Sequence, residues 1–81
     1  MDKLDYAILN FLTTNQATSK MKAKTRTDML DNLDMGKHTL YRRIVKLINK
    51  RYVERGFTEG QQHAYFITET GTIKLQEAMG Q

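Results

Sequence analysis

The sequence contains no cysteine, a single serine, and no apolar run long enough to span a membrane. The absence of cysteine excludes disulfide frameworks, thiol nucleophiles and metal sites with cysteine ligands. A membrane span needs about 18 consecutive apolar residues, and the N-terminus has no apolar segment of the kind found in signal peptides. We therefore expect a cytoplasmic protein that has no membrane partner.

Catalytic patterns are also missing from the sequence. Ser19 is the only serine, no glycine-rich phosphate loop is present, and no pair of acids is placed with a base. His38 and His63 have neither the spacing nor the carboxylate neighbours of a metal site. The sequence predicts a protein that is not an enzyme and that uses no cofactor, metal or small-molecule ligand.

Positive charge is concentrated in two segments of the 81-residue chain, which we treat as one domain over residues 1–81. Residues 20–26 carry a net charge of +4 and residues 37–55 carry +6, whereas the whole chain carries +4. The remaining residues must therefore carry −6. A cationic face opposite a neutral or acidic one is typical of proteins that bind phosphate groups. The alternative is that these cations only keep a small domain soluble.

Two elements are expected before the segment that has a helix-turn-helix layout. Apolar residues at three- and four-residue intervals predict a helix over residues 1–14, with Asp2 favouring its N-terminus. After a polar loop, the alternation in residues 20–24 predicts a short strand that points Met21 and Ala23 inward.

Residues 25–50 have a helix-turn-helix layout. Thr25 or Thr27 can cap a helix over residues 25–33, with Asp28 in a capping-box relation to Thr25, and Gly36 supplies the turn. The second helix, residues 37–50, has an apolar side opposite a polar and basic one. The apolar side holds Leu40, Ile44, Leu47 and Ile48. A helix with one side to bury and one cationic side suits entry into a DNA groove.

The period of the sequence changes from helical to alternating after residue 51. Residues 52–57 and 63–68 are strand candidates rich in β-branched and aromatic residues, and the polar loop 58–62 is long enough for a hairpin tip. Residues 68–71 then open a short final helix. The predicted fold class is α+β.

Three segments carry a resemblance to winged helix-turn-helix domains of small bacterial, archaeal and phage transcription regulators of the MarR, PadR and ArsR groups. Residues 39–47 (TLYRRIVKL) resemble their recognition helix, residues 52–55 (YVER) their first wing strand, and residues 66–71 (FITETG) their strand-exit motif Leu-Thr-Glu-x-Gly. The resemblance implies a three-helix core, a two-stranded β-hairpin wing and a short C-terminal helix. In the strand-exit motif the threonine caps the next helix and the glycine fits a close approach.

One position departs from this family pattern. The family usually ends its recognition helix with glycine, where this chain has Arg51. A residue other than glycine there either adopts a left-handed backbone conformation at some cost or shifts the end of the helix.

The resemblance implies a transcriptional regulator or repressor, of the kind that phages and plasmids also carry, with double-stranded DNA as its partner. Residues 37–50 would enter the major groove and residues 52–68 would form the wing. Expected base contacts are His38, Thr39 and Arg42, with Tyr41 and Arg43 at the groove rim. Expected phosphate contacts are Thr25, Arg26, Thr27, Lys37 and Lys46. Expected wing contacts are Arg55, Thr58, Gln61, Gln62 and His63.

Alternatives stay open at this point. A winged helix in a replication or transcription assembly can bind protein and not DNA, since fold does not settle function. Lys46 has the alternative role of solvating the helix, and Tyr41 that of packing. One module buries only about 600–1,000 Å² on DNA, which limits the sequence specificity of a monomer. A homodimer on a palindromic site is the usual way to raise that specificity. The chain lacks the long C-terminal helix with which many of these regulators dimerise.

Overall fold

Asp2 starts the first helix of the protein. In the computed structural model, which describes residues 1–80, α1 spans Lys3–Thr14. The Asp2 carboxylate accepts hydrogen bonds from the backbone N–H groups of Leu4 and Asp5, and the Asp5 carboxylate accepts one from the Asp2 N–H. This capping box satisfies amides that have no partner within the helix. The predicted helix is confirmed, and it begins just after Asp2 because that residue keeps an extended backbone.

The strand predicted after the first loop is wrong in part. The chain forms a 3₁₀ turn, η1 (Lys20–Lys22), and then a two-residue strand, β1 (Lys24–Thr25). The Lys22 N–H donates to the carbonyl of Ser19 at 3.1 Å, which curls the backbone and breaks the alternation of sides. Met21 is therefore 85% exposed and does not point inward as predicted.

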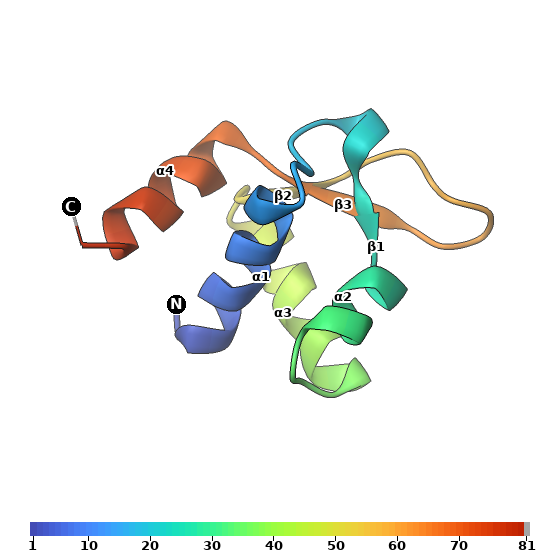
Figure 1. Ribbon diagram of the computed structural model, residues 1–81, viewed down its shortest axis with the longest axis horizontal. Helices are drawn as coiled ribbons and strands as arrows, with labels where there is room; N and C mark the ends of the chain where they lie inside the picture. Colours follow the sequence, from blue (N-terminus) through green and yellow to red (C-terminus); the bar gives the residue numbers. More distant parts are fainter. Residues whose placement is uncertain (81) are drawn as a thin grey trace.

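The predicted helix-turn-helix is confirmed by α2 (Arg26–Asn32) and α3 (Lys37–Asn49), which follow one another below the sheet in Figure 1. The Thr25 hydroxyl accepts from the Asp28 N–H at 3.1 Å, and the Asp28 carboxylate accepts from the Thr25 N–H at 3.0 Å. The expected capping box is thus present. Gly36 precedes α3 with φ −74°, so the turn does not depend on the conformational freedom of glycine.

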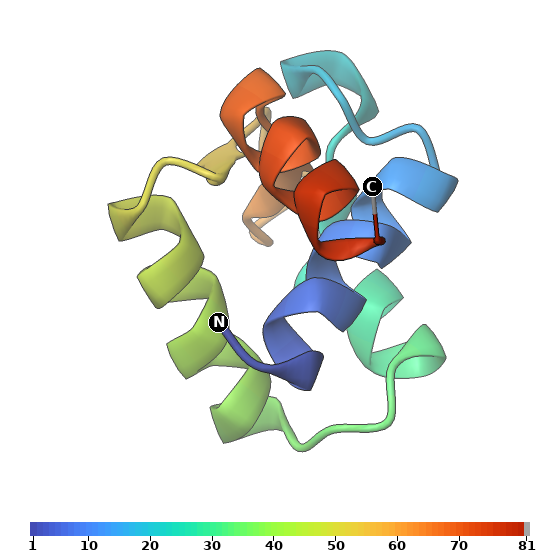
Figure 2. The ribbon, with the colours of Figure 1, turned by 90° about the vertical axis from the view of Figure 1, so that its left-hand side faces the viewer.

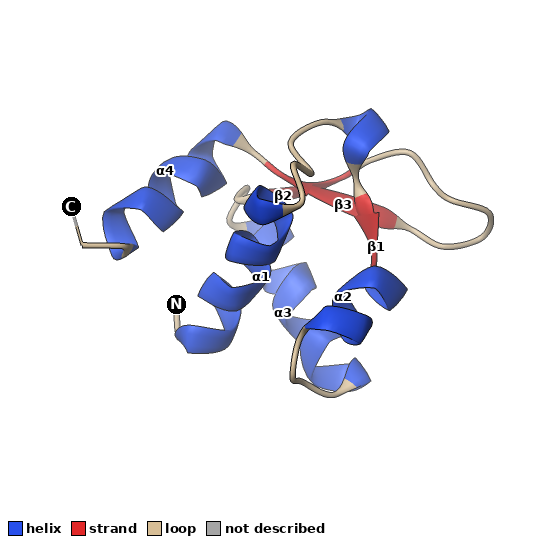
Figure 3. Cartoon of the chain, in the orientation of Figure 1, coloured by secondary structure: helices blue, strands red, loops and turns tan. Residues whose placement is uncertain are grey.

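The sheet has one strand more than the predicted wing. Strands β2 (Val53–Arg55) and β3 (Ala64–Ile67) form the predicted antiparallel hairpin, in shorter form. β1 pairs with the other edge of β3, which gives the strand order β1-β3-β2 (Figure 3). The extra strand ties the start of α2 directly to the wing.

The junction between β3 and α4 (Glu69–Ala78) follows the strand-exit motif. The Thr68 hydroxyl accepts from the Gly71 N–H at 3.0 Å and donates to the carbonyl of Arg51 at 2.7 Å. A Cβ on Gly71 would overlap the Tyr52 carbonyl oxygen, so this approach requires glycine. The predicted roles of this threonine and this glycine are confirmed. Arg51 has φ 65°, which is the first of the two conformations expected for it.

The core lies between the helices and the sheet, as Figures 1 and 2 show. α1 contacts α3, α4 and β3, and the largest fully buried side chains come from three helices and two strands. They include Ile8, Leu9, Leu12, Met29, Leu40, Ile44, Leu47, Val53, Tyr65 and Ile67. Within residues 1–80, no helix has the length and apolar character needed to cross a membrane. The four helices and the three-stranded sheet form a winged helix-turn-helix fold.

Candidate functional site

Helix α3 separates its apolar and basic side chains. Leu40, Ile44 and Leu47 are buried against the rest of the protein, as their helical spacing predicts. The opposite side faces solvent, and the hollow on it is lined by Thr39, Arg42, Arg43 and Lys46. The basic side of α3 can therefore be reached by a ligand along the length of the helix.

The N-terminal end of α3 has no side-chain cap. Gly36 occupies the cap position and has no side chain that could accept from the first amides of the helix. Lys37 and His38, which follow it, are exposed. Free amides and the positive end of the helix dipole favour an anion at such a position, and Lys37 adds a full positive charge. This end of α3 is suited to a phosphate group.

A cation–π contact joins the start of α2 to α3. The Arg26 guanidinium carbon lies 5.2 Å from the centroid of the Tyr41 ring. Tyr41 is 43% exposed, so the stacked side chain remains partly accessible to solvent. The stacking holds Arg26 over the first turns of α3 and leaves its N–H groups free to donate to an acceptor outside the protein.

The wing is fastened to the start of α2. The Thr27 hydroxyl donates to Gln62 Oε1 at 2.8 Å, across 35 positions of sequence. Two backbone hydrogen bonds between Glu59 and Gln62 close the wing tip around Gly60, which has φ 63°. A hollow at this junction is lined by Arg26, Thr27, Leu30, Lys37, Leu40 and Gln62. Residues from α2, α3 and the wing, far apart in sequence, thus form one continuous surface.

Two residues expected at this surface have roles inside the fold. Thr25 is only 3% exposed, and its hydroxyl caps α2. Arg43 Nη1 lies 2.6 Å from Asp2 Oδ1 and 3.3 Å from Asp5 Oδ1, at the start of α1. Hydrogen bonding to Asp2 raises the pKa of the Arg43 guanidinium, and the same bond lowers the pKa of the Asp2 carboxyl. Arg43 therefore holds α3 against α1 and does not point freely into solvent.

The remaining wing residues that the sequence predicts as contacts are exposed. They are Arg55, Thr58, Gln61 and His63.

Two features were missed from the sequence. Asp5 is a buried carboxylate, which its spacing of three residues from Asp2 could have indicated as half of a capping box. Phe57 is 61% exposed, and no local pattern distinguishes it from a buried strand aromatic.

Comparisons with known proteins agree with this architecture. No family model matches the sequence. The chain is 32% identical over 79 residues to the DNA-binding protein TubR of Clostridium botulinum C phage, with 98% of each chain covered. The solved structure of TubR from Bacillus megaterium pBM400 is similar with a TM-score of 0.89 and 25% identity, over 100% of this chain and 89% of that one. The chain belongs to the TubR family.

Proposed function

We propose that this protein binds double-stranded DNA, with α3 in the major groove and residues 52–68 as a wing against the neighbouring backbone or minor groove. The carrying observation is the continuous surface formed by the start of α2, the uncapped start of α3 and the wing. Arg26 of α2 and Lys37 of α3 border one hollow with Gln62 of the wing, so that cations from two elements are available to the phosphates of a duplex. The phage relative, similar over its full length, is a DNA-binding protein.

The surface divides into three kinds of contact. His38, Thr39 and Arg42 lie on the open side of the first turns of α3 and are assigned to base edges. Phosphate contacts are assigned to Arg26, Thr27, Lys37 and Lys46, with Tyr41 supporting Arg26 at the groove rim. Wing contacts are assigned to Arg55, Thr58, Gln61, Gln62 and His63. Thr25 and Arg43 are left out, because their side chains serve the fold.

The biological role follows from where such a site lies on DNA. Repression of transcription, which the resemblance to MarR, PadR and ArsR regulators implies, requires the bound site to overlap a promoter. A homodimer on a palindromic site would double the contacts of a single module and raise its specificity. Binding to this DNA, as a single module or as a homodimer, requires the protein to be in the cytoplasm, where the DNA is. Binding of protein without DNA is disfavoured, because the phage relative, which is similar over its full length, is a DNA-binding protein.

Gel retardation with a nonspecific duplex over a salt series tests the proposal. Affinity should fall by about 0.9 log units per log unit of salt for each phosphate that the protein neutralises. Absence of retardation even at low salt would overturn it.

Two variants of Gly36 sharpen this test. A side chain at Gly36 meets no atom within 4 Å, so both Gly36→Ser and Gly36→Asp can cap α3 without a clash. Only the aspartate places a negative charge where a phosphate would bind. We expect Gly36→Asp to bind DNA more weakly than Gly36→Ser at equal thermal stability, and equal affinities would contradict a phosphate contact at this helix end.

A further inference from the structure

A second exposed surface lies at the base of the wing, away from the start of α3. Met21 in η1 and Phe57 after β2 are 85% and 61% exposed, although both are large apolar side chains. They belong to segments more than thirty residues apart in sequence, which the fold brings together. We call this pair, together with Lys20, Lys22 and Lys24, the η1 patch.

The backbone beneath the η1 patch is fixed by direct contacts. The Phe57 N–H donates to the Lys20 carbonyl at 3.2 Å, and the neighbouring Gly56 N–H donates to the Ala64 carbonyl at 2.9 Å. A Cβ on Gly56 would overlap the Ala23 Cβ and the Lys20 carbonyl oxygen, so the two segments approach this closely only because residue 56 is glycine. The exposed pair is therefore presented by a held backbone, which lowers the entropy cost of binding a ligand there.

The η1 patch combines apolar surface with unpaired positive charge. Within residues 1–80, the ion pairs are those of Arg43 with Asp2 and Asp5, and none involves a lysine of the patch. Lys20 and Lys22 are exposed and flank Met21 directly in the sequence, and Lys24 follows at the start of β1. This combination is complementary to a ligand that carries both negative charge and an apolar side chain.

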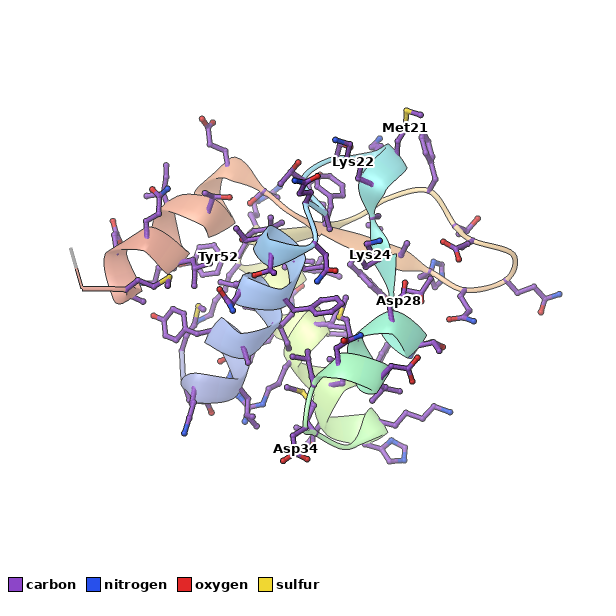
Figure 4. All side chains as sticks on the ribbon, in the orientation of Figure 1. Met21, Lys22, Lys24, Asp28, Asp34 and Tyr52 are labelled. Atoms are coloured by element: carbon purple, nitrogen blue, oxygen red, sulfur yellow. The ribbon has the colours of Figure 1, made fainter. Side chains whose placement is uncertain are left out.

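The location of the η1 patch separates it from the first turn of α3. In Figure 1 and in the perpendicular view of Figure 2, η1 lies at the upper edge of the molecule and the start of α3 at the lower edge. Figure 4 shows Met21 and Lys22 on this upper edge, with Asp34, just before α3, at the opposite one. A ligand on the η1 patch would leave the start of α3 open.

We infer that the η1 patch docks an acidic peptide segment of a protein partner, with an aromatic or branched apolar side chain of that segment placed between Met21 and Phe57. Duplex DNA would pair with the lysines through its phosphates, but it presents its apolar groups inside the grooves, away from the phosphates that the lysines would contact. A membrane-binding surface needs a longer apolar stripe than these two side chains supply. A short acidic segment with one apolar anchor satisfies both halves of the patch.

Selection from a displayed library of peptides of about 12 random residues tests the inference. The full chain serves as bait, after removal of peptides that bind the double variant Met21→Ser/Phe57→Ser. Enriched peptides should contain aspartate or glutamate around a phenylalanine, leucine or tryptophan. Absence of enrichment, or enrichment of basic peptides, would overturn the inference.

An enriched peptide, labelled and followed by fluorescence anisotropy, then locates the site. Affinity should fall at least about tenfold for Phe57→Ser and for Lys20→Glu/Lys22→Glu. Ile73→Ser, which removes an apolar side chain that is 51% exposed on α4, is the matched control and should bind normally. All variants should keep the thermal midpoint of the parent.

Two further outcomes would count against the inference. Equal peptide affinity of Phe57→Ser and the parent would place binding elsewhere. Displacement of the peptide by a short duplex or by phosphatidylglycerol vesicles would assign the η1 patch to DNA or to a membrane. The test does not depend on DNA binding through α3, so the two proposals can fail separately.

Discussion

Arg43 in α3 and Asp2 at the start of α1 form the closest ion pair of the described chain, with 2.6 Å between Nη1 and Oδ1. The same Nη1 lies 3.3 Å from the buried carboxylate of Asp5. Asp2 and Asp5 also cap α1, so a single guanidinium connects the capping box of one helix to the side of another. The orientation of α3 against α1 therefore depends on Arg43, which the sequence alone would assign to the exposed cations of this helix.

Replacing Arg43 by alanine should destabilise the protein. The change leaves the buried Asp5 carboxylate without its guanidinium partner, and an uncompensated buried charge is costly. Urea unfolding should give a lower midpoint for Arg43→Ala than for Arg42→Ala, which removes the same side chain from an exposed position next to it. Equal midpoints would show that the ion pair contributes nothing to stability.

The Arg43–Asp2 pair should also make stability depend on pH. Hydrogen bonding from Arg43 lowers the pKa of the Asp2 carboxyl in the folded state, so the unfolded chain binds this proton more readily. The stabilisation is present at neutral pH and is lost as the pH falls through the folded pKa, below the ordinary value of about 3.9. Asp2→Asn keeps a capping side chain but loses the charge. Its stability deficit, measured by urea unfolding, should shrink as the pH falls below about 4, and a constant deficit would contradict this linkage.

Arg51 is a strained position that a substitution can relieve. Its φ of 65° is a left-handed conformation that costs a residue with a Cβ roughly 1–2 kcal/mol. Glycine removes this cost but gains freedom in the unfolded chain, so Arg51→Gly should stabilise by about 0.5–1 kcal/mol. The hydrogen bond from Thr68 reaches the backbone carbonyl of Arg51 and survives the change. Thermal unfolding of Arg51→Ala provides the control, since alanine keeps the strain and should give no such gain.

The parts of the fold that could be predicted from the sequence are those with local signals. Thr25 and Asp28 lie three positions apart and form the capping box that their spacing predicts, and Thr68 accepts from the Gly71 N–H as the resemblance to the strand-exit motif implies. The buried side of α3 follows from helical periodicity. These features need no knowledge of where distant segments lie.

Features that depend on distant contacts could not be predicted. Arg43 contacts Asp2 across 41 positions of sequence. Its charge and its place on α3 therefore predict an exposed DNA-binding residue, whereas the side chain forms an ion pair between two helices. The pairing of β1 with β3, and the contact that holds the exposed Phe57 beside Lys20, likewise join segments that are far apart in sequence. In the candidate site, the exposed side of α3 follows from helical periodicity apart from Arg43, whereas the fastening of Gln62 to Thr27 could not be predicted.

Arg42 and Lys46 lie one helical turn apart on the exposed side of α3 and border the same hollow, which makes them a matched pair for separating base readout from phosphate attraction. Arg42 is assigned to a bidentate contact with guanine, worth about 1–3 kcal/mol of discrimination. Arg42→Ala should therefore relax sequence preference at one position of the bound site. Lys46→Ala should weaken binding to all sequences alike and lower the salt slope by about one phosphate. Selection from a randomised duplex library, followed by affinity measurements, distinguishes these results. If both variants lose affinity for every sequence equally, Arg42 does not read a base.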